Sequence, residues 1–550
     1  MPHVVTGTCC ADASCVLACP VNCIHPAPGE PGFGTTDMLF IDPATCVGCS
    51  ACVTACPVGA IVPDTKLTIE TAPYAALNAE YFERSPHADR TPLALVAPQR
   101  RLRRGGPFRV AVIGAGPAGL YTADELLKHP EVASVDVYDK LHTPHGLVRH
   151  GVAPDHATTK KVTDLFEAIE NEPGFRYVLG AEVGTTVTVA QLQSVYHAVV
   201  FAVGASSDRL LGIPGENLTG SVAATDVVGW YNGHPDHRDA AVTLDHERAV
   251  VVGNGNVALD VARMLTRDTE WLTERTDIAP HALDQLRGSQ IREVQILGRR
   301  GPADAAFTVP ELMGLAALTD VDVIVEADPA QLQGDDQRSR LLAELAARPR
   351  STDATRRRIV LTFAVSPVEI LGEDGRVSGV RVARNDLVEG ADGAVVAVPT
   401  SDEYVLDAGL VVRSVGFRGV GLPGLPFDER TGTVPNDRGR VAPGVFVVGW
   451  IKRGPRGFIG TNKTCAQETV EAVLDHLDSD ITEPHHTPDD LIAATIPQAG
   501  DLAAWRRLDA EELALGRRIG RPRVKIVDRL DQEAVAARVN VRAPRRLLRT

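Results

Sequence analysis

The pattern of apolar and polar positions predicts two strand–turn–helix–strand units. Residues 109–113, RVAVI, form an apolar run typical of a buried strand, and a glycine turn and an amphipathic helical pattern follow. The strand VDVYD at 135–139 completes this unit, and the same order recurs over residues 249–297, ending in EVQIL. Two such units indicate a doubly wound α/β architecture. Apolar runs at 198–204 and 406–417 are predicted to complete the sheets.

The ends of the chain have a different pattern. Residues 1–84 are acidic, with a net charge of -6, whereas residues 85–109 carry six arginines against Asp89. Prolines and a glycine pair predict a linker there. After about residue 485 the pattern is helical, and the basic stretch RVNVRAPRRLLRT at the end is interpreted as a solvated tail.

Composition narrows the class of protein. A chain of 550 residues is too long for one hydrophobic core, and 44% hydrophobic with 23% charged residues is ordinary for a globular protein. A net charge of -15 argues against nucleic-acid binding. No signal peptide and no apolar stretch of membrane-spanning length stands in the sequence. We therefore expect a cytoplasmic protein without membrane insertion.

Nine of the ten cysteines precede residue 57 and favour a metal centre over disulfides. The run CVGCSACVTACP, residues 46–57, spaces its cysteines by two, two and three residues before a proline, which is typical of iron–sulfur clusters. Zinc sites usually pair two shorter units further apart. The run CCADASCVLACP, residues 9–20, keeps the same frame from Cys9 but has Asp12 at the second cysteine position.

In paired runs, the fourth cysteine ligates the other cluster. The sequence therefore predicts a [4Fe–4S] cluster on Cys46, Cys49, Cys52 and Cys19. The other site retains Cys9, Cys15, Cys56 and Asp12, and a carboxylate is a poor substitute for a thiolate. We expect a [3Fe–4S] cluster there, with an Asp12-ligated, labile [4Fe–4S] cluster as the alternative. Cys10 is an alternative to Cys9, and Cys23 is expected to be a core residue beside a cluster. Residues 1–65 closely resemble a seven-iron bacterial ferredoxin.

The first glycine turn, Gly114, Gly116 and Gly119, lies between a strand and a helix, and Asp139 ends the next strand. The glycines let the backbone approach a pyrophosphate at the helix N-terminus, and Asp139 is placed to bind a ribose. Pro117 is typical of turns that bind FAD. The second turn runs from Gly253 to Ala258, and its next strand ends in Arg299 and Arg300. An arginine pair accepts a 2′-phosphate, so NADP(H) is predicted there.

Five separated motifs resemble the adrenodoxin reductase family of NADPH–ferredoxin reductases over roughly residues 107–525. They are VAVIGAGPAGLY, GLVRHGVAPDH (146–156), VVGNGNVALDVARML (251–265), GRRGPADAAFTVPEL (298–312) and VGWIKRGPRGFIGTNK (448–463). The resemblance implies a doubly wound α/β flavoprotein with FAD and NADP domains, here preceded by an α+β ferredoxin-like iron–sulfur domain. The implied bounds are 1–84 for the iron–sulfur domain, 85–106 for a basic linker, 107–208 with 416–550 for the FAD domain and 209–415 for the NADP domain.

The resemblance also implies the residues of the sites. For FAD they are Ala115, Asp139, Leu147 and Val183, with Trp450, Gly457, Phe458 and Ile459 against the flavin. For NADP they are Asn254, Gly255, Asn256, Val257, Arg299, Arg300 and Glu311, with Gly457 near the nicotinamide. His156 and Asp260 match residues at the junction of the two cofactors and are the candidate catalytic pair. Their expected role is to orient that junction and to modulate flavin protonation.

The expected function is a ferredoxin–NADP reductase with a built-in ferredoxin. NADPH would reduce FAD, and FAD would then reduce the clusters. Electrons would pass on to a soluble ferredoxin or a haem monooxygenase, or flow in the reverse direction to make NADPH. A glutamate-synthase-like subunit is one alternative, against which GLVRHGVAPDH and GWIKRGPRGFIGTNK count; a flavin and iron–sulfur redox sensor is another. We also expect the basic run RRLRR to hold the acidic ferredoxin module loosely near the flavin. Alternatively, these arginines only solubilise a hinge.

Overall fold

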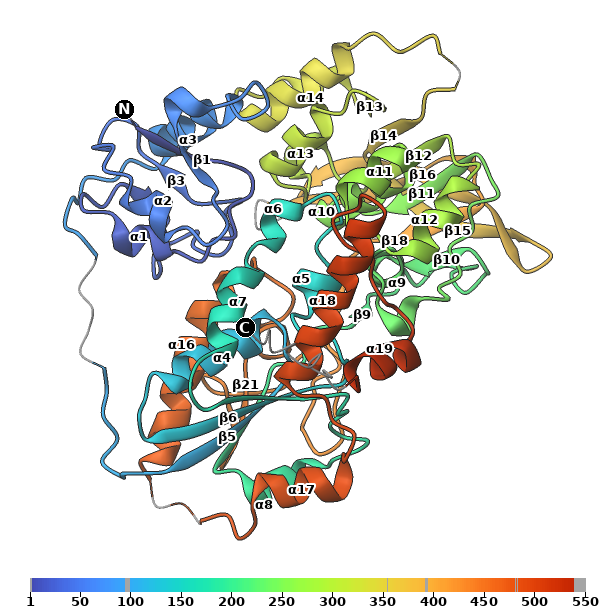
Figure 1. Cartoon of the computed structure of the whole chain (residues 1–550). Helices are drawn as coiled ribbons and strands as arrows, with labels where there is room; N and C mark the ends of the chain where they lie inside the picture. Colours follow the sequence, from blue (N-terminus) through green and yellow to red (C-terminus); the bar gives the residue numbers. More distant parts are fainter. Residues whose placement is uncertain are drawn as a thin grey trace, which may run out of the picture.

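The computed structural model describes residues 2–93, 99–353, 355–390, 394–479, 481 and 483–538. A small N-terminal module, shown in dark blue, lies beside two larger parts that are each built on a six-stranded sheet (Figure 1). The last part of the chain, in red, returns to run along both larger parts.

The N-terminal module is a compact α+β unit. Strand β1 (His3–Val5) pairs with β4 (Ile61–Pro63), and β2 (Ile24–His25) pairs with β3 (Phe40–Ile41), both antiparallel. Two short helices, α1 (Ser14–Ala18) and α2 (Ala51–Ala55), pack together, and the longer α3 (Pro73–Arg84) closes the module. Buried Asn78 of α3 fixes this arrangement, because its side-chain oxygen accepts hydrogen bonds from the backbone of Val5 and Ile41.

The first large sheet has the strand order β20-β21-β8-β5-β6-β7. The five strands β21, β8, β5, β6 and β7 run parallel, whereas β20 is antiparallel to its neighbour β21. The predicted strands form β5, β6 and β8, and the sheet is completed by two strands far along the chain. The bounds are β5 (Phe108–Ile113), β6 (Val132–Asp139), β7 (Phe175–Leu179), β8 (Ala198–Phe201), β20 (Arg440–Ala442) and β21 (Val445–Val447). Helices α4 (Pro117–Leu127) and α16 (Thr461–Leu477) pack against each other beside it.

The second large sheet is entirely parallel, in the order β10-β18-β11-β12-β14-β13. Its strands are β10 (Ser221–Ala223), β11 (Arg248–Val252), β12 (Glu293–Gly298), β13 (Asp322–Glu326), β14 (Arg358–Phe363) and β18 (Leu410–Arg413). The run predicted at 406–417 contributes β18. The surrounding helices include α9 (Ala224–Asn232), α10 (Asn256–Thr266), α11 (Thr269–Arg275), α12 (Pro280–Arg287), α13 (Val309–Ala316) and α14 (Gln337–Ala347).

An antiparallel sheet of three strands extends from the second part: β15 (Val365–Glu373), β16 (Arg376–Glu389) and β17 (Val395–Asp407). The two large parts are joined by a two-stranded link in which β9 (Ser207–Asp208) pairs with β19 (Phe417–Arg418). The chain therefore enters and leaves the second part at neighbouring positions.

The C-terminal segment contributes buried charges at the contact between the two large parts. It forms α17 (Pro488–Thr495), α18 (Leu502–Arg518) and α19 (Arg529–Ala536). The Lys525 ammonium is buried and lies 3.1 Å from Asp277 of the second part, which also pairs with Lys160 of the first at 2.7 Å. The helical pattern after residue 485 thus has a structural role that its sequence did not indicate. Most of the predicted solvated tail, residues 539–550, lies outside the described residues.

The linker arginines contact the first large part. Arg100, Arg103 and Arg104 pair with Asp475, Asp478 and Glu483, in and just after α16, at 2.6, 3.1 and 3.0 Å. Arg101 lies 3.7 Å from Glu131. The expectation that these arginines hold the ferredoxin module was wrong, because acidic residues at the end of α16 are the nearer partners.

Candidate functional site

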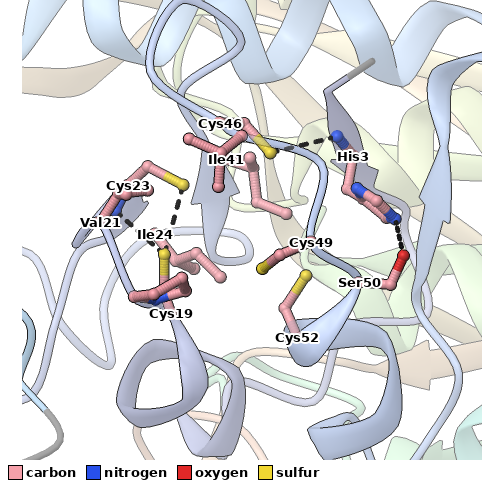
Figure 2. A pocket seen from close by; sticks show the side chains of 12 residues that line it. His3, Cys19, Val21, Cys23, Ile24, Ile41, Cys46, Cys49, Ser50 and Cys52 are labelled. Atoms are coloured by element: carbon pink, nitrogen blue, oxygen red, sulfur yellow. Dashed lines mark hydrogen bonds between the residues drawn. The ribbon is translucent and has the colours of Figure 1, made fainter.

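Four cysteine side chains converge on one pocket of the N-terminal module (Figure 2). Cys19 follows α1, whereas Cys46, Cys49 and Cys52 come from the second run, and His3, Ile24 and Ile41 are among the other residues of the lining. Burial and the neighbouring Cys46 raise the pKa of Cys52 to about 12. Neighbouring thiolates repel one another, which makes each thiol harder to ionise. A positively charged metal centre would compensate this repulsion. The residues fit a four-cysteine iron–sulfur cluster.

Buried Cys23 lines the same pocket, and its Sγ lies 3.4 Å from that of Cys19. Hydrogen bonding from the Cys23 thiol lowers the pKa of Cys19 to about 6 and that of Cys46 to about 5. The same bonds raise the pKa of Cys23, so its thiol keeps its proton. Cys23 therefore acts as a donor beside the pocket, and the thiolate ligands expected of Cys19 and Cys46 are favoured.

The second cysteine group surrounds Asp12. Burial raises the pKa of Cys9 to about 11, and the charges of Cys56 and Asp12 add to the effect. Burial also raises the pKa of Cys15, with contributions from Cys9 and Asp12. The structure therefore brings the three predicted cysteines and the carboxylate together. The Cys10 thiol is buried beside them, so the alternative between Cys9 and Cys10 stays open.

The two cysteine runs share one backbone conformation. The residue before α1, Ala13, is left-handed at φ 60°, and the residue before α2, Ser50, is left-handed at φ 63°. Cys19 and Cys56 then end the two helices in the same extended conformation, at φ -76° and -79°. The sequence repeat is therefore a structural repeat in which Asp12 occupies the place of Cys49.

The Asp12 group lies against the first large part of the molecule. The Gly460 amide donates to the Cys10 carbonyl at 2.8 Å, and a Cβ at Gly460 would overlap the backbone of Asp12. Ser14 donates to the Asp12 carboxylate, and Lys463 of α16 donates to Ser14 at 3.0 Å. In contrast, Cys49 of the four-cysteine pocket is exposed. We call the Asp12 group the near site and the four-cysteine pocket the far site.

The first glycine turn is shaped by close backbone contacts. Gly114 has φ +114°, and a Cβ there would meet the Ala202 carbonyl, while a Cβ at Gly119 would overlap the Gly114 carbonyl. Asp139 accepts hydrogen bonds from the Ala115 amide at 2.8 Å and the Leu141 amide at 2.9 Å. The turn therefore leads directly into α4, whose N-terminus is a suitable place for a pyrophosphate.

The other residues expected at FAD differ in their surroundings. Leu147 opens α5 (Leu147–His150) and is 41% exposed, and Trp450 opens α15 (Trp450–Arg453) with its ring 5.5 Å from that of Phe417. Gly457, Phe458 and Ile459 form the loop that enters α16, directly before Gly460. Val183 is buried in an apolar cluster on the first sheet, so its side chain is already packed by protein.

The second glycine turn precedes α10, whose first residue is Asn256 with Gly255 at the cap. Asn254 accepts a hydrogen bond from the Ala306 amide at 3.3 Å, and Asn256 accepts one from the Thr308 amide at 2.8 Å. These bonds hold the loop after β12 beside the turn. Arg299 and Arg300 stand at the end of β12, Arg299 exposed and Arg300 half-buried. A free helix N-terminus and two guanidinium groups fit a phosphorylated dinucleotide. Val257 follows on α10.

His156, Asp260 and Glu311 meet in one cluster, where their ligand atoms lie within 4.8 Å of one another. Arg263, 3% exposed, joins them: it donates to His156 Nε2 at 2.7 Å, to Asp260 at 2.5 Å and to Glu311 at 3.1 Å. A guanidinium only donates, so Nε2 of His156 accepts and its proton lies on Nδ1. Asp155 accepts a further bond from Arg263 at 2.9 Å.

The carboxyl groups of this cluster have different proton affinities. Burial raises the pKa of Asp260 to about 6 despite Arg263, with Glu311 adding to the rise. Burial acts in the same direction on Asp155, but Arg263 and His156 outweigh it and lower the pKa of Asp155 to about 2. Sequence reasoning missed Arg263 and Asp155. The available signal was an arginine three residues after Asp260 on an otherwise apolar helix face.

Comparison with known families matches two segments of the chain. Residues 108–301 match the family described as pyridine nucleotide-disulphide oxidoreductase, and residues 39–62 match the 4Fe-4S binding domain. No helix within the described ranges has the length and apolar character needed to cross a membrane.

Individual relatives cover 78% to 98% of the chain. A Mycobacterium tuberculosis protein named probable ferredoxin/ferredoxin–NADP reductase is 48% identical over 98% of this chain and 95% of its own length. The Arabidopsis thaliana mitochondrial NADPH:adrenodoxin oxidoreductase is 37% identical over 78% of this chain and 96% of its own. The solved structure of Mycobacterium tuberculosis FprA in complex with NADPH has a TM-score of 0.74 and 44% identity, covering 78% of this chain and 99% of that one.

Proposed function

The chain belongs to the ferredoxin/ferredoxin–NADP reductase family, and from this we propose that its docked N-terminal module serves as the first electron acceptor of its own reductase. It is an oxidoreductase, an NADPH–ferredoxin reductase with a built-in ferredoxin module, and its relatives support this function over the two alternatives considered from sequence. FAD and NADP(H) are its nucleotide cofactors, and its N-terminal module contains a 4Fe-4S binding domain. When bound, FAD converts the two-electron chemistry of NADPH into the one-electron chemistry of the clusters.

The observation that carries the proposal is the contact between the near site and the loop before α16. The Gly460 amide reaches the Cys10 carbonyl, and the missing side chain of Gly460 lets the backbones of the loop and of Asp12 meet. Gly457, Phe458 and Ile459, the residues proposed to face the flavin, directly precede this contact. The contact thus sets which cysteine site faces the reductase.

The proposal divides the chain as the sequence suggested. Residues 1–84 are assigned to the ferredoxin module and 85–106 to the linker. Residues 107–208 with 416–550 are assigned to the FAD domain, and 209–415 to the NADP domain. The proposed FAD residues are Gly114, Ala115, Gly116, Gly119, Asp139, Leu147, Val183, Trp450, Gly457, Phe458 and Ile459. The proposed NADP residues are Asn254, Gly255, Asn256, Val257, Arg299, Arg300, Glu311 and Gly457.

His156 and Asp260 are proposed to orient the junction of the two cofactors. Arg263 holds both of them by hydrogen bonds and fixes the proton of His156 on Nδ1. Asp260, whose pKa is raised to about 6 by burial, is the carboxyl of this cluster that can exchange a proton near neutral pH. Their contribution is positioning and proton affinity.

The two cysteine sites are proposed to differ in cluster type. The far site has four thiols for a [4Fe–4S] cluster, and the near site has three with Asp12, which favours [3Fe–4S] over a labile Asp-ligated [4Fe–4S] cluster. An external acceptor, a soluble ferredoxin or a haem monooxygenase, would approach the exposed Cys49 side. Ten free cysteines suit a reducing compartment, so the proposed location is the cytoplasm.

Stopped-flow spectroscopy of the intact, cluster-loaded protein tests the proposal. NADPH should bleach the flavin first and the clusters afterwards, and the second rate should not change when protein concentration is varied tenfold. A cluster rate that rises in proportion to protein concentration would show that reductase and ferredoxin modules of different molecules react, and the docked arrangement would then have no role.

The NADP assignment has a separate test. Replacing Arg299 and Arg300 by alanine removes charge-assisted bonds worth about 1.5–3 kcal/mol each, so KM for NADPH should rise at least tenfold. KM for NADH should change little, because NADH has no 2′-phosphate. Equal losses with both nucleotides would contradict the assignment.

A further inference from the structure

A third candidate metal centre lies in the ferredoxin module, outside both cysteine sites. It consists of His25 on β2, Glu30 in the following loop and His87 just after α3. Their ligand atoms lie within 4.8 Å of one another. Nδ1 of His25 is 2.9 Å from Oε2 and 3.1 Å from Oε1 of Glu30, and Nδ1 of His87 is 3.9 Å from Oε1.

These separations bracket those of a tetrahedral zinc site. With zinc–nitrogen and zinc–oxygen bonds of about 2.0–2.1 Å, neighbouring ligand atoms are about 3.3 Å apart. The contacts at 2.9 and 3.9 Å lie on either side of this value. The two imidazole rings lie against each other, with centroids 3.7 Å apart, so they must turn apart for both Nδ1 atoms to bind one ion. Two imidazoles and a carboxylate are also ligand types that zinc accepts.

The surroundings of the two rings favour ligation. Nε2 of buried His25 lies 3.0 Å from the Asn22 carbonyl, which directs Nδ1 toward Glu30. Metal-binding histidines usually have such a partner on the other ring nitrogen. Both nitrogens of His25 thus face acceptor atoms, and a cation on Nδ1 would leave Nε2 to donate to the Asn22 carbonyl.

The side chain of Asn22 offers a partner for the second ring. Its Oδ1 is buried without a hydrogen bond among the described residues, while its Nδ2 lies 3.3 Å from Nε2 of His87. A cation on Nδ1 of His87 requires a proton on Nε2. Rotating the Asn22 amide would place Oδ1 opposite that proton, at the cost of the bond from Nδ2 to the Asp89 carbonyl. The orphaned oxygen would then have a donor.

Glu30 provides the negative charge. Partial burial tends to raise the pKa of Glu30, but the Ala27 amide, which donates at 2.7 Å, and the His25 ring outweigh this and hold the pKa below its usual value. Side-chain exposures of 31% for Glu30 and 26% for His87 leave one side of the cluster open to solvent.

We propose that His25, Glu30 and His87 form a Zn²⁺ site, with water as the fourth ligand on the open side. His87 stands three residues beyond the end of α3, at the start of the linker. A cation held by these three residues would clamp the start of the linker to β2 and the loop that follows. This fixes where the chain leaves the ferredoxin module, independently of the reductase reaction.

The test uses the intact protein with FAD and its full iron content. After incubation with ZnCl₂ and desalting, mass spectrometry should find one zinc per FAD, and X-ray absorption at the zinc edge should show nitrogen and oxygen ligands with two imidazoles. His87→Ala and Glu30→Gln should lose this zinc, and His485→Ala, at an exposed loop histidine, should retain it. No retained zinc, sulfur ligation, or zinc retained by His87→Ala would overturn the site.

Trypsin cleavage after Arg90 tests the clamp itself. If the segment opens only after zinc leaves, a zinc concentration of about 100 times Kd should lower the population of the opened state about 100-fold. Cleavage should slow correspondingly in the wild-type protein and not in His87→Ala. Retained zinc with unchanged cleavage would overturn the clamp.

Discussion

The near and far sites of the ferredoxin module share one backbone conformation but differ in their surroundings. Left-handed Ala13 and Ser50 begin the two short helices, and extended Cys19 and Cys56 end them. Where the far site has exposed Cys49, the near site has buried Asp12. The repeated sequence therefore determines the local conformation, and the departure from the repeat falls at the face that meets the reductase.

The difference shows how a duplicated motif acquires two roles. Asp12 accepts a bond from Ser14, which in turn accepts one from Lys463, so the substituted position belongs to a polar contact between the module and α16. Cys49, at the corresponding position of the far site, is exposed instead. The near and far sites therefore differ both in the residue at the ligand position and in the surroundings of that residue. Mutations can change either one separately.

The largest effect should come from breaking the contact at the near site. Gly460→Val would force a side chain into the backbone of Asp12, and because φ of Gly460 is -70°, the change tests space rather than backbone strain. Electron transfer slows as the distance between donor and acceptor grows, and a displaced module would depend on its covalent tether for encounters. NADPH should therefore reduce the clusters on the order of tenfold more slowly, with an unchanged rate of flavin reduction in stopped-flow measurements.

Gly314→Ala on α13 is the control, because a Cβ there meets nothing within 4 Å. It should leave both rates unchanged. If Gly460→Val reduces its clusters as fast as the wild-type protein, the near site does not depend on this contact.

Exchanging the ligands should reverse the difference between the sites. Asp12→Cys restores a fourth thiolate, so iron content should rise from about seven to about eight per chain, and electron paramagnetic resonance should lose its [3Fe–4S] signal. Cys49→Asp makes the converse change at the far site and should remove about one iron there. Unchanged spectra for Asp12→Cys would show that residue 12 does not face a cluster.

The smallest effect is expected at the linker. Arg100, Arg103 and Arg104 pair with exposed or terminal acids of the first large part, and such surface pairs contribute about 0–1 kcal/mol. Replacing all three by glutamine should change the rate of cluster reduction less than about twofold at any salt concentration. A large, salt-dependent loss would restore the idea that these arginines position the ferredoxin module.

Local sequence signals predicted the parts of the fold that depend on near neighbours. The glycines at 114 and 119 are required by carbonyl groups that leave no room for a Cβ, and such constraints are visible as a motif. The cysteine frame is likewise local. His156 and Asp260 were predicted to lie at the junction of the two cofactors and Glu311 to hold NADP, and the structure brings the three together.

Contacts between distant segments could not be predicted in this way. Arg263 stands among apolar helix residues, and only the fold shows that it joins Asp260 of its own helix to acceptors in two distant segments, at residues 155–156 and at Glu311. Lys525 and Asp277 are far apart in the sequence, and their pairing depends on how the large parts pack. The linker arginines were assigned to the wrong acidic surface because net charge does not identify a partner.

The pairing of β8 with β21 also constrains how the protein is made. Val199 lies opposite Val445, so the first sheet cannot be completed until about 250 further residues are synthesised, roughly 12–50 s at about 5–20 residues per second. The last helix of the ferredoxin module, α3, ends at residue 84, and all the cysteine ligands of the module lie within the first tenth or so of the chain. On the ribosome, its near site is therefore accessible to iron delivery before the loop that will cover it exists.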